Sequence, residues 1–299
     1  MVSILIPTYN AASSLRALLD VLSRQRLPLF EIIMVDSSST DSTLSIATTY
    51  GVQTHVIQKR EFDHGGTRTF MGSLAKGDVL VYMTQDALPV DDTALPSLVS
   101  TLLADERIGA AFGRQIPHRD ATLFAQHLRE FNYTTESYTR TIQDRERYGM
   151  KTIFCSNSFA AYRRKALETV GWFKADLLMG EDMRACAAML KEGYSIAYVA
   201  EASVYHSHNY SLRQEFKRYF DLGVFFSKEE WILDEFGYVE GEGLRFILSE
   251  FSFLKRNGFL HYVPISLLRM MAKGLGYRLG HLHACLPRGI IRRLSMHSQ

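Results

Sequence analysis

The chain has 299 residues, of which 46 % are hydrophobic and 22 % are charged. These values are typical of a folded globular protein and exclude a disordered, collagenous or coiled-coil chain. The net charge is +2, from 34 basic and 32 acidic residues, but it is unevenly spread. Residues 255–299 contain eight Lys or Arg and no Asp or Glu, so residues 1–254 have a net charge of −6. A basic tail on an acidic body predicts an anionic partner, either phospholipid or nucleic acid.

Short apolar runs alternate with helical patterns in the first part of the chain. We predict strands over residues 2–6, 31–35, 52–57 and 79–83. The first helix has Ser13 or Ser14 as its predicted cap, and Asp41 is the predicted cap of a second helix that ends near Tyr50. Strands that alternate with helices predict βαβ units, and hence an α/β fold with a parallel sheet that helices cover on both faces.

The second part of the chain predicts shorter strands and then helices. Strand-like pieces cover residues 110–112, 159–162, 196–199 and 203–205, and a helix covers residues 181–193. Beyond Leu212 the pattern becomes helical and rich in aromatic residues. We therefore expect an α/β domain over residues 1–211 and a helical C-terminal region over residues 212–299.

Three predicted strands end in polar residues. Ligands of parallel sheets bind at the carboxyl ends of the strands, so these residues should line one crevice. A carboxylate there can accept the N–H of a pyrimidine ring or a ribose hydroxyl, although a turn or a helix cap explains a single Asp equally well. The strand-end residues are Pro7, Thr8, Tyr9 and Asn10 after the first strand, Asp36 after the second, and Gln85 and Asp86 after the fourth.

The run from His64 through Gly65 and Gly66 to Arg68 predicts a glycine turn that opens a helix. Backbone N–H groups at a helix start attract anions, and Arg68 could add a charge-assisted contact to a diphosphate. A glycine turn followed by a surface arginine is the alternative. The run is neither a P-loop nor a dinucleotide-binding motif.

Two further groups could carry chemistry. Asp86 could hold Mg²⁺ or Mn²⁺ against substrate phosphates, and His206 or His208 could add a nitrogen ligand once the chain folds back. An exposed pair of histidines at a strand end is the alternative. Glu181 and Asp182 open a predicted helix, where acidic residues often act only as caps. The functional interpretation is that one of the two carboxylates is a general base.

Taken together, these residues resemble the inverting glycosyltransferases of family 2, which have the GT-A fold. The likeness covers about residues 1–210, and its segments occur in the order of the family. Segments 62–68, 84–87 and 205–211 are similar to bacterial rhamnosyltransferases within that family. The matching features are residues 2–10, Asp36 with the Ser-Ser-Ser-Thr-Asp that follows it, Asp86, Asn157, residues 171–173 and residues 180–182.

The resemblance implies a donor, an acceptor and a role for each residue. The donor would be dTDP-L-rhamnose and the acceptor a lipid-linked surface polysaccharide precursor. Thr8 and Asp36 would meet the pyrimidine nucleoside and Arg68 the nucleotide, with Pro7, Tyr9, Asn10, His64 and Gln85 beside them. Asp86 and one of His206 and His208 would hold the metal, and Asp182, next to Glu181, would be the base.

One departure from the family pattern keeps other hypotheses open. The acidic DxD of the family is here Thr84-Gln85-Asp86, with a single carboxylate. A UDP-hexose or UDP-N-acetylhexosamine donor on the same fold is one alternative. A non-catalytic subunit that binds a nucleotide or a glycan is another.

The location of the chain also follows from its sequence pattern. No apolar stretch reaches the roughly 20 residues of a spanning helix, and no signal peptide is evident, so we expect a cytoplasmic protein. The three cysteines, Cys155, Cys186 and Cys285, are expected to be reduced and buried.

The basic tail contains one amphipathic pattern. After Pro264, a stripe of Leu and Met recurs at three- and four-residue spacing from Leu268 to Leu282, with Arg269 and Lys273 on the other side. Such a helix suits the cytoplasmic face of an anionic membrane. The alternative is that the stripe packs on the body or on a second copy in a homo-oligomer. Nucleic acid is the least supported partner, because the body is acidic and has no recognised nucleic-acid-binding module.

Overall fold

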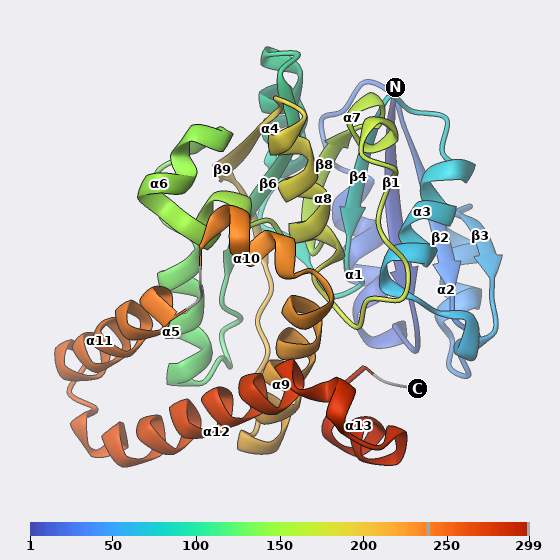
Figure 1. Cartoon of the computed structure of the whole chain (residues 1–299). Coiled ribbons are helices and arrows are strands. Elements are labelled where there is room, and N and C mark those ends of the chain that lie inside the picture. Colours follow the sequence, from blue (N-terminus) through green and yellow to red (C-terminus); the bar gives the residue numbers. More distant parts are fainter. Residues whose placement is uncertain (238–239, 298–299) are drawn as a thin grey trace.

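The computed structural model describes residues 1–237 and 240–297. These residues form a nine-stranded mixed sheet with helices packed on it (Figure 1). The strand order is β3 (Gln53–Val56), β2 (Phe30–Asp36), β1 (Val2–Thr8), β4 (Val79–Met83), β8 (Phe159–Arg163), β6 (Ile108–Ile116), β9 (Ser195–Tyr205) and β5 (Leu88–Pro89), and β7 (Tyr138–Arg140) pairs with β9. Strands β1 to β4 are parallel, whereas β8 is antiparallel to both of its neighbours. The predicted fold class is therefore confirmed.

Helices cover both faces of the sheet and define two cores. One core contains α1 (Ala12–Leu22), α2 (Thr43–Thr49) and α4 (Ala94–Ala104). The other contains α3 (His64–Leu74), α7 (Arg164–Thr169), α8 (Glu181–Lys191), α9 (Leu212–Lys228) and α10 (Glu230–Phe236). In β1, Ile4 and Ile6 point into the first core and Leu5 into the second, and all three are fully buried. Burial on both faces explains why the central strands are continuous apolar runs.

The remaining elements are short connections and a C-terminal group of helices. The helices are α5 (Leu123–Asn132), α6 (Arg145–Tyr148), α11 (Glu240–Arg256), α12 (Val263–His281) and α13 (Arg288–Leu294), and the 3₁₀ turns are η1 (Lys59–Glu61), η2 (Ile142–Asp144), η3 (Gly149–Ile153), η4 (Leu260–Tyr262) and η5 (His283–Cys285). In Figure 1, α11 and α12 form a hairpin that extends along the lower edge of the molecule, away from the sheet. Pro264 lies in the first turn of α12, as predicted.

Two local predictions need correction. Helix α1 begins at Ala12, and neither Ser13 nor Ser14 caps it. The N–H groups of Ala11 and Ala12 instead bond Thr43 Oγ1 at 2.7 Å and Asp41 Oδ2 at 3.0 Å, so the next loop caps this helix. The two strands predicted over residues 196–199 and 203–205 are one strand, β9, whose pairing with β6 shifts register between them.

Cysteine burial and membrane spanning can be compared directly with the predictions. Cys155, Cys186 and Cys285 are all free thiols, and the first two are buried, but Cys285 is exposed because it lies in the turn after α12. Among the described residues, no helix has both the length and the apolar character needed to cross a bilayer.

Candidate active site

The polar strand ends meet at one edge of the sheet. Thr8 and Asp36 are register partners at the ends of the parallel strands β1 and β2, and β4 runs in the same direction. Strand β8 is antiparallel, so its first residue, Phe159, pairs with Met83 at the end of β4. Strand β9 is parallel to β6, which is in turn antiparallel to β8, so β9 also ends at this edge. The topology thus brings residues from four distant segments together.

Asp36 organises the loop at the end of β2. Its side chain is fully buried, and it accepts hydrogen bonds from Thr8 Oγ1 (2.9 Å), Ser39 N (2.7 Å) and Ser39 Oγ (2.6 Å). Asn10 lies beside it with a left-handed φ of +48° and accepts a bond from the N–H of Thr40 at 2.9 Å. Asp36 thus holds the loop at the end of β2 in shape.

Gln85 ties the end of β4 to the end of β1. Its Oε1 accepts the N–H of Tyr9 at 2.8 Å, and its Nε2 donates to the Tyr9 carbonyl at 3.1 Å. The Tyr9 ring is exposed next to Pro7 and Asn10, and its hydroxyl accepts a bond from Lys59 Nζ at 2.9 Å. Gln85 thus fixes the position of Asp86, which follows it in the chain.

The start of α3 differs from the expectation for an open anion site. Asp63 caps this helix and accepts the N–H of Gly66 at 2.5 Å, so a carboxylate already occupies the helix start. A Cβ at Gly65 would lie only 1.9 Å from the carbonyl oxygen of Lys174, and this close approach explains the glycine. Gly65 therefore serves close packing, and Asp63 already accepts one N–H of the helix start.

Arg68 forms a buried ion pair instead of a surface contact. Its guanidinium lies 3.2 Å from Glu181 Oε1, and both side chains are about 5 % exposed. Arg68 also donates to the His64 carbonyl at 3.0 Å, while Asn157 Nδ2 donates to Glu181 at 3.0 Å. Burial opposes ionisation of Glu181, but Arg68 and then His64 outweigh it and hold the pKa of Glu181 below its usual value.

Asp182 has the opposite protonation behaviour. Its oxygens accept the N–H groups of Asn157 (3.0 Å) and Met183 (2.8 Å), and the side chain remains partly exposed. Burial, followed by the neighbouring charge of Glu181, raises the pKa of Asp182 to about 7. A carboxylate that exchanges a proton near neutral pH has the pKa expected of a general base, whereas a helix cap does not need a raised pKa.

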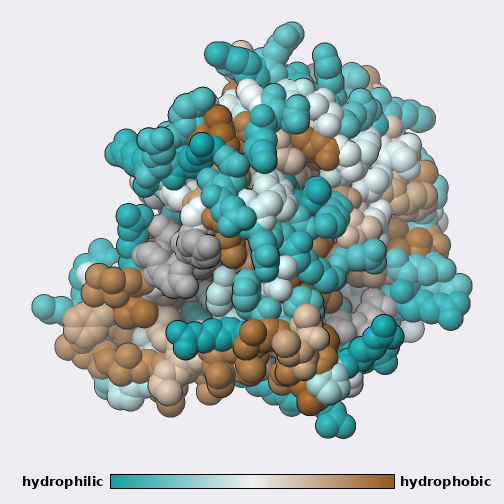
Figure 2. Space-filling model, in the orientation of Figure 1, coloured by the Kyte–Doolittle hydropathy of each residue, from teal (hydrophilic) through white to brown (hydrophobic). Residues whose placement is uncertain are grey.

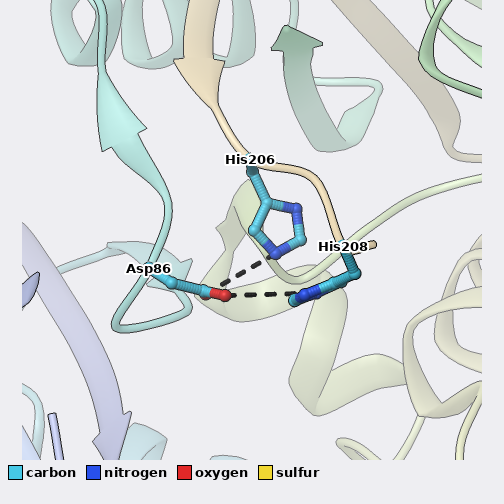
Figure 3. Close-up of side chains that lie close together, drawn as sticks. All are labelled: Asp86, His206 and His208. Carbon is cyan, nitrogen blue, oxygen red and sulfur yellow. Dashed lines mark ion pairs between the residues drawn. The ribbon is translucent and has the colours of Figure 1, made fainter. Parts of the chain in front are cut away.

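Asp86, His206 and His208 form a group that could hold a metal ion (Figure 3). Their ligand atoms all lie within 4.8 Å of one another. Asp86 Oδ1 is 3.5 Å from His206 Nε2, and Asp86 Oδ2 is 4.0 Å from His208 Nε2. Both histidines thus join Asp86 at the predicted site, and neither is excluded as a ligand.

The protonation states in this group suit metal binding. His206 Nδ1 lies 2.9 Å from Gln115 Oε1, which can only accept, so Nδ1 is the protonated nitrogen and Nε2 directs its lone pair towards Asp86. Burial lowers the pKa of His206 to about 3, although Asp86 opposes this shift. Burial by itself would raise the pKa of Asp86, but the neighbouring groups, His206 first among them, together outweigh it, and the net shift of that pKa is downward. A neutral imidazole and an ionised carboxylate are the forms that coordinate Mn²⁺ or Mg²⁺.

Several residues of this edge escaped the sequence analysis. Gln115 on β6 orients His206, and Ser39 fixes Asp36. His297, which follows α13, lies edge-to-face on His64 with ring centroids 5.0 Å apart, and its N–H bonds Asp221 Oδ2 at 3.1 Å. No local pattern signals the contacts of Gln115 and His297, because they join segments that are far apart in the chain, whereas Ser39 lies only three residues after Asp36.

Comparison with known proteins decides the family. The model of glycosyl transferase family 2 matches residues 3–171, which is more than half of the chain. The chain belongs to glycosyltransferase family 2. Among the relatives of this glycosyltransferase is the O-antigen chain rhamnosyltransferase WbaN of Salmonella anatum, which is 44 % identical over 99 % of this chain and 94 % of that protein. The O-antigen chain rhamnosyltransferase RfbN of Salmonella typhimurium is 42 % identical over the same shares.

Solved structures agree with the GT-A fold of this glycosyltransferase. The mannosyltransferase PcManGT from Pyrobaculum calidifontis, solved with GDP-Man and Mn²⁺, has a TM-score of 0.62 at 19 % identity and covers 98 % of this chain and 86 % of its own. Glucosyl-3-phosphoglycerate synthase from Mycobacterium tuberculosis, solved with Mn²⁺ and UDP, has a TM-score of 0.56 at 16 % identity and covers 79 % and 80 %. The family resemblance and the enzyme class predicted from the sequence are thus confirmed.

The metal group of this glycosyltransferase can be tested by direct binding. Asp86→Asn and His206→Gln should each abolish measurable Mn²⁺ binding by calorimetry, because each removes a ligand. Gln115→Leu should weaken Mn²⁺ binding by about 10- to 100-fold, since it only orients His206. His118→Gln is the matched control, because the His118 ring stacks on Tyr205 outside the group. Wild-type affinity in Asp86→Asn would contradict the assignment.

The raised pKa of Asp182 predicts a pH profile. Only the deprotonated form can accept a proton, so kcat/KM should rise with pH, reach half of its plateau near pH 7 and fall about tenfold per unit below that. Glu181 stays ionised over this range, because its pKa is lowered. A profile that is flat between about pH 5 and 8 would show that Asp182 is not the titrating base.

Proposed function

We propose that this glycosyltransferase moves L-rhamnose from dTDP-L-rhamnose to a hydroxyl of a lipid-linked surface polysaccharide precursor, with inversion at the anomeric carbon. The observation that carries the chemistry is a carboxylate of raised pKa, Asp182, at the same sheet edge as the Asp86, His206 and His208 group. The sugar and the acceptor are supported by near-full-length similarity to two O-antigen chain rhamnosyltransferases. A nucleotide-sugar donor and a glycan acceptor are consistent with both lines of support.

The proposed roles at the donor side follow the contacts at the sheet edge. Thr8 and Asp36 form the wall of the nucleoside pocket, and Pro7, Tyr9, Asn10 and Gln85 form its rim. Asp86, with His206 and His208, would hold Mg²⁺ or Mn²⁺, and the ion would supply positive charge to the diphosphate of the donor. His64 and Arg68 form the boundary between donor and base, where Arg68 serves as the counter-ion of Glu181.

The proposed reaction is an in-line displacement. A bound divalent cation supplies Lewis-acid stabilisation of the departing diphosphate, an effect worth several kcal/mol. The acceptor oxygen forms a bond to the anomeric carbon as the bond from that carbon to the phosphate oxygen breaks. Asp182 takes the hydroxyl proton, and Asn157 and Met183 hold its oxygens in place through their N–H groups. Attack from the side opposite the leaving group inverts the configuration.

The proposed division of the chain assigns residues 1–211 to nucleotide-sugar binding and catalysis. Residues 212–299, of which 238–239 and 298–299 lie outside the described structure, are the helical region that we assign to the membrane or to a homo-oligomer. The proposed place of action is the cytoplasmic face of the cell membrane, where a lipid-linked acceptor is presented. Helices α9 and α10 contribute to the same core as α3, α7 and α8, so the start of this region is packed against the proposed catalytic part.

The base assignment can be tested with a single substitution. Asp182→Asn should lower turnover by about 10²- to 10⁴-fold, because general-base catalysis contributes that much, and should leave the Kd of dTDP-L-rhamnose nearly unchanged. Asp78→Asn is the control, since Asp78 is an exposed carboxylate at the opposite end of β4. Normal turnover in Asp182→Asn would remove Asp182 from the mechanism.

The donor can be identified by thermal shift with Mg²⁺ or Mn²⁺ present. dTDP-L-rhamnose at a hundred times its Kd should stabilise the folded chain by about 2.7 kcal/mol, and UDP-glucose or UDP-N-acetylglucosamine at equal concentration should stabilise it less. A larger shift with a UDP-sugar would favour the alternative donor. Binding without hydrolysis or transfer would favour the non-catalytic subunit.

A further inference from the structure

The hairpin of α11 and α12 carries an exposed apolar surface, which we name the apolar band. On each helix the residues recur at three- and four-residue spacing, so they form one face. Each is between 49 % and 69 % exposed. Figure 2 shows apolar residues gathered along the lower edge of the molecule, where α11 and α12 run in Figure 1. The apolar band consists of Leu244, Leu248 and Phe251 on α11 and Leu268, Met271 and Leu275 on α12.

The side of α12 that faces the body is polar and small. Arg269 NH2 and Lys273 Nζ lie 2.8 Å and 3.5 Å from Glu215 Oε1 on α9, and Glu215 and Lys273 are buried. A Cβ on Gly280 would lie 2.0 Å from the carbonyl oxygen of Phe220, so the two helix backbones are in close contact. A helix that packs on a globular core normally turns its leucines inward. Here ion pairs and glycine hold the helix, and the leucines face outward.

The segment that carries the α12 part of the apolar band, residues 255–299, is positively charged. Residues 255–299 contain no Asp or Glu. Two of their cationic side chains, Arg269 and Lys273, form ion pairs with Glu215. The other six are exposed; they are Lys255, Arg256, Arg278, Arg288, Arg292 and Arg293. An apolar face with a basic border is the composition of a helix that lies in the headgroup region of an anionic bilayer.

We propose that the apolar band seats this chain on an anionic lipid bilayer, with the exposed cations of α12 and α13 at the level of the headgroups. The proposal deepens the proposed function, on which its place at the cytoplasmic face rests, but the surface itself rests on exposure and charge. A second copy of the chain is the less suitable occupant. A twofold interface brings the same surface together twice, and here it would bring together the exposed cations of residues 255–299, which contain no Asp or Glu.

Two successive contacts link α12 to the candidate active site. Arg269 on α12 donates to the carbonyl oxygen of Tyr210 at 3.0 Å. The Tyr210 ring in turn stacks on His208, with centroids 5.2 Å apart. Helix α12, which carries half of the apolar band, is thus joined through Tyr210 to the segment of His206 and His208.

Vesicle co-sedimentation of the full chain tests the apolar band. We expect the wild-type chain to pellet with phosphatidylcholine vesicles that contain phosphatidylglycerol. The triple variant Leu268→Glu, Met271→Glu and Leu275→Glu should partition at least tenfold less. The matched control is Leu29→Glu with Leu103→Glu, two leucines that are equally exposed outside the hairpin, and it should pellet like the wild type. Unfolding curves confirm that each variant is folded.

A second variant tests the charges without touching the apolar band. Arg288→Gln with Arg292→Gln and Arg293→Gln should lower the partition onto phosphatidylglycerol vesicles by about fivefold per residue, and should leave the weak partition onto pure phosphatidylcholine unchanged. Unchanged pelleting of both triple variants would overturn the proposal. So would a wild-type dimer in analytical ultracentrifugation that the Leu268, Met271 and Leu275 variant converts to a monomer with no loss of vesicle binding.

Donor hydrolysis in the absence of vesicles separates this proposal from the proposed function. The apolar-band variant should hydrolyse dTDP-L-rhamnose at the wild-type rate, since none of its substitutions lies in the donor or base pocket. Vesicle binding without hydrolysis of dTDP-L-rhamnose would contradict the proposed donor and leave the proposed bilayer contact standing. Hydrolysis without vesicle binding would do the reverse.

Discussion

The buried ion pair between Arg68 and Glu181 is the contact on which the proposed chemistry depends. It joins α3 to the first residue of α8, and each charge needs the other because neither is in water. Loss of one partner of such a pair typically costs about 3–5 kcal/mol. Burial is the larger cause of the raised pKa of Asp182, and the charge of the ionised Glu181 beside it adds to the shift, so that this pKa rises to about 7. One pair thus fixes the position of α8 and adjusts the proton affinity of the base.

The metal group follows the same principle of support from neighbouring strands. A single carboxylate, Asp86, stands where the family has an acidic DxD, and two imidazoles join it. The ligands come from the ends of β4 and β9, and Gln115 on β6 fixes the tautomer of His206. Because all three strands belong to one sheet, the group is assembled on a rigid support, which is a requirement for a well-defined ligand geometry.

The C-terminal helices show how a fold can turn an amphipathic helix outward. The polar side of α12 is held against the body by Glu215 and by the close backbone contact at Gly280, so its leucines remain exposed on the molecular surface. In the proposed function, this outward face would bring the site to an acceptor that is attached to a lipid. A glycan attached to a lipid stays at a bilayer, and an enzyme seated there searches in two dimensions for its substrate.

The amino-acid sequence by itself determined the fold class, the positions of most strands, the family and most of the residues at the sheet edge, but it indicated neither β5 nor β7 and divided β9 in two. Apolar runs that end in polar residues are local signals, and parallel topology alone brings Thr8, Asp36 and Asp86 to one edge. Only the tertiary structure decided that Arg68 pairs with Glu181, that Asp63 closes the start of α3, and which face of α12 is exposed. These outcomes depend on contacts between segments distant in the chain, and a periodic pattern reports the two faces of a helix without telling which one meets the body.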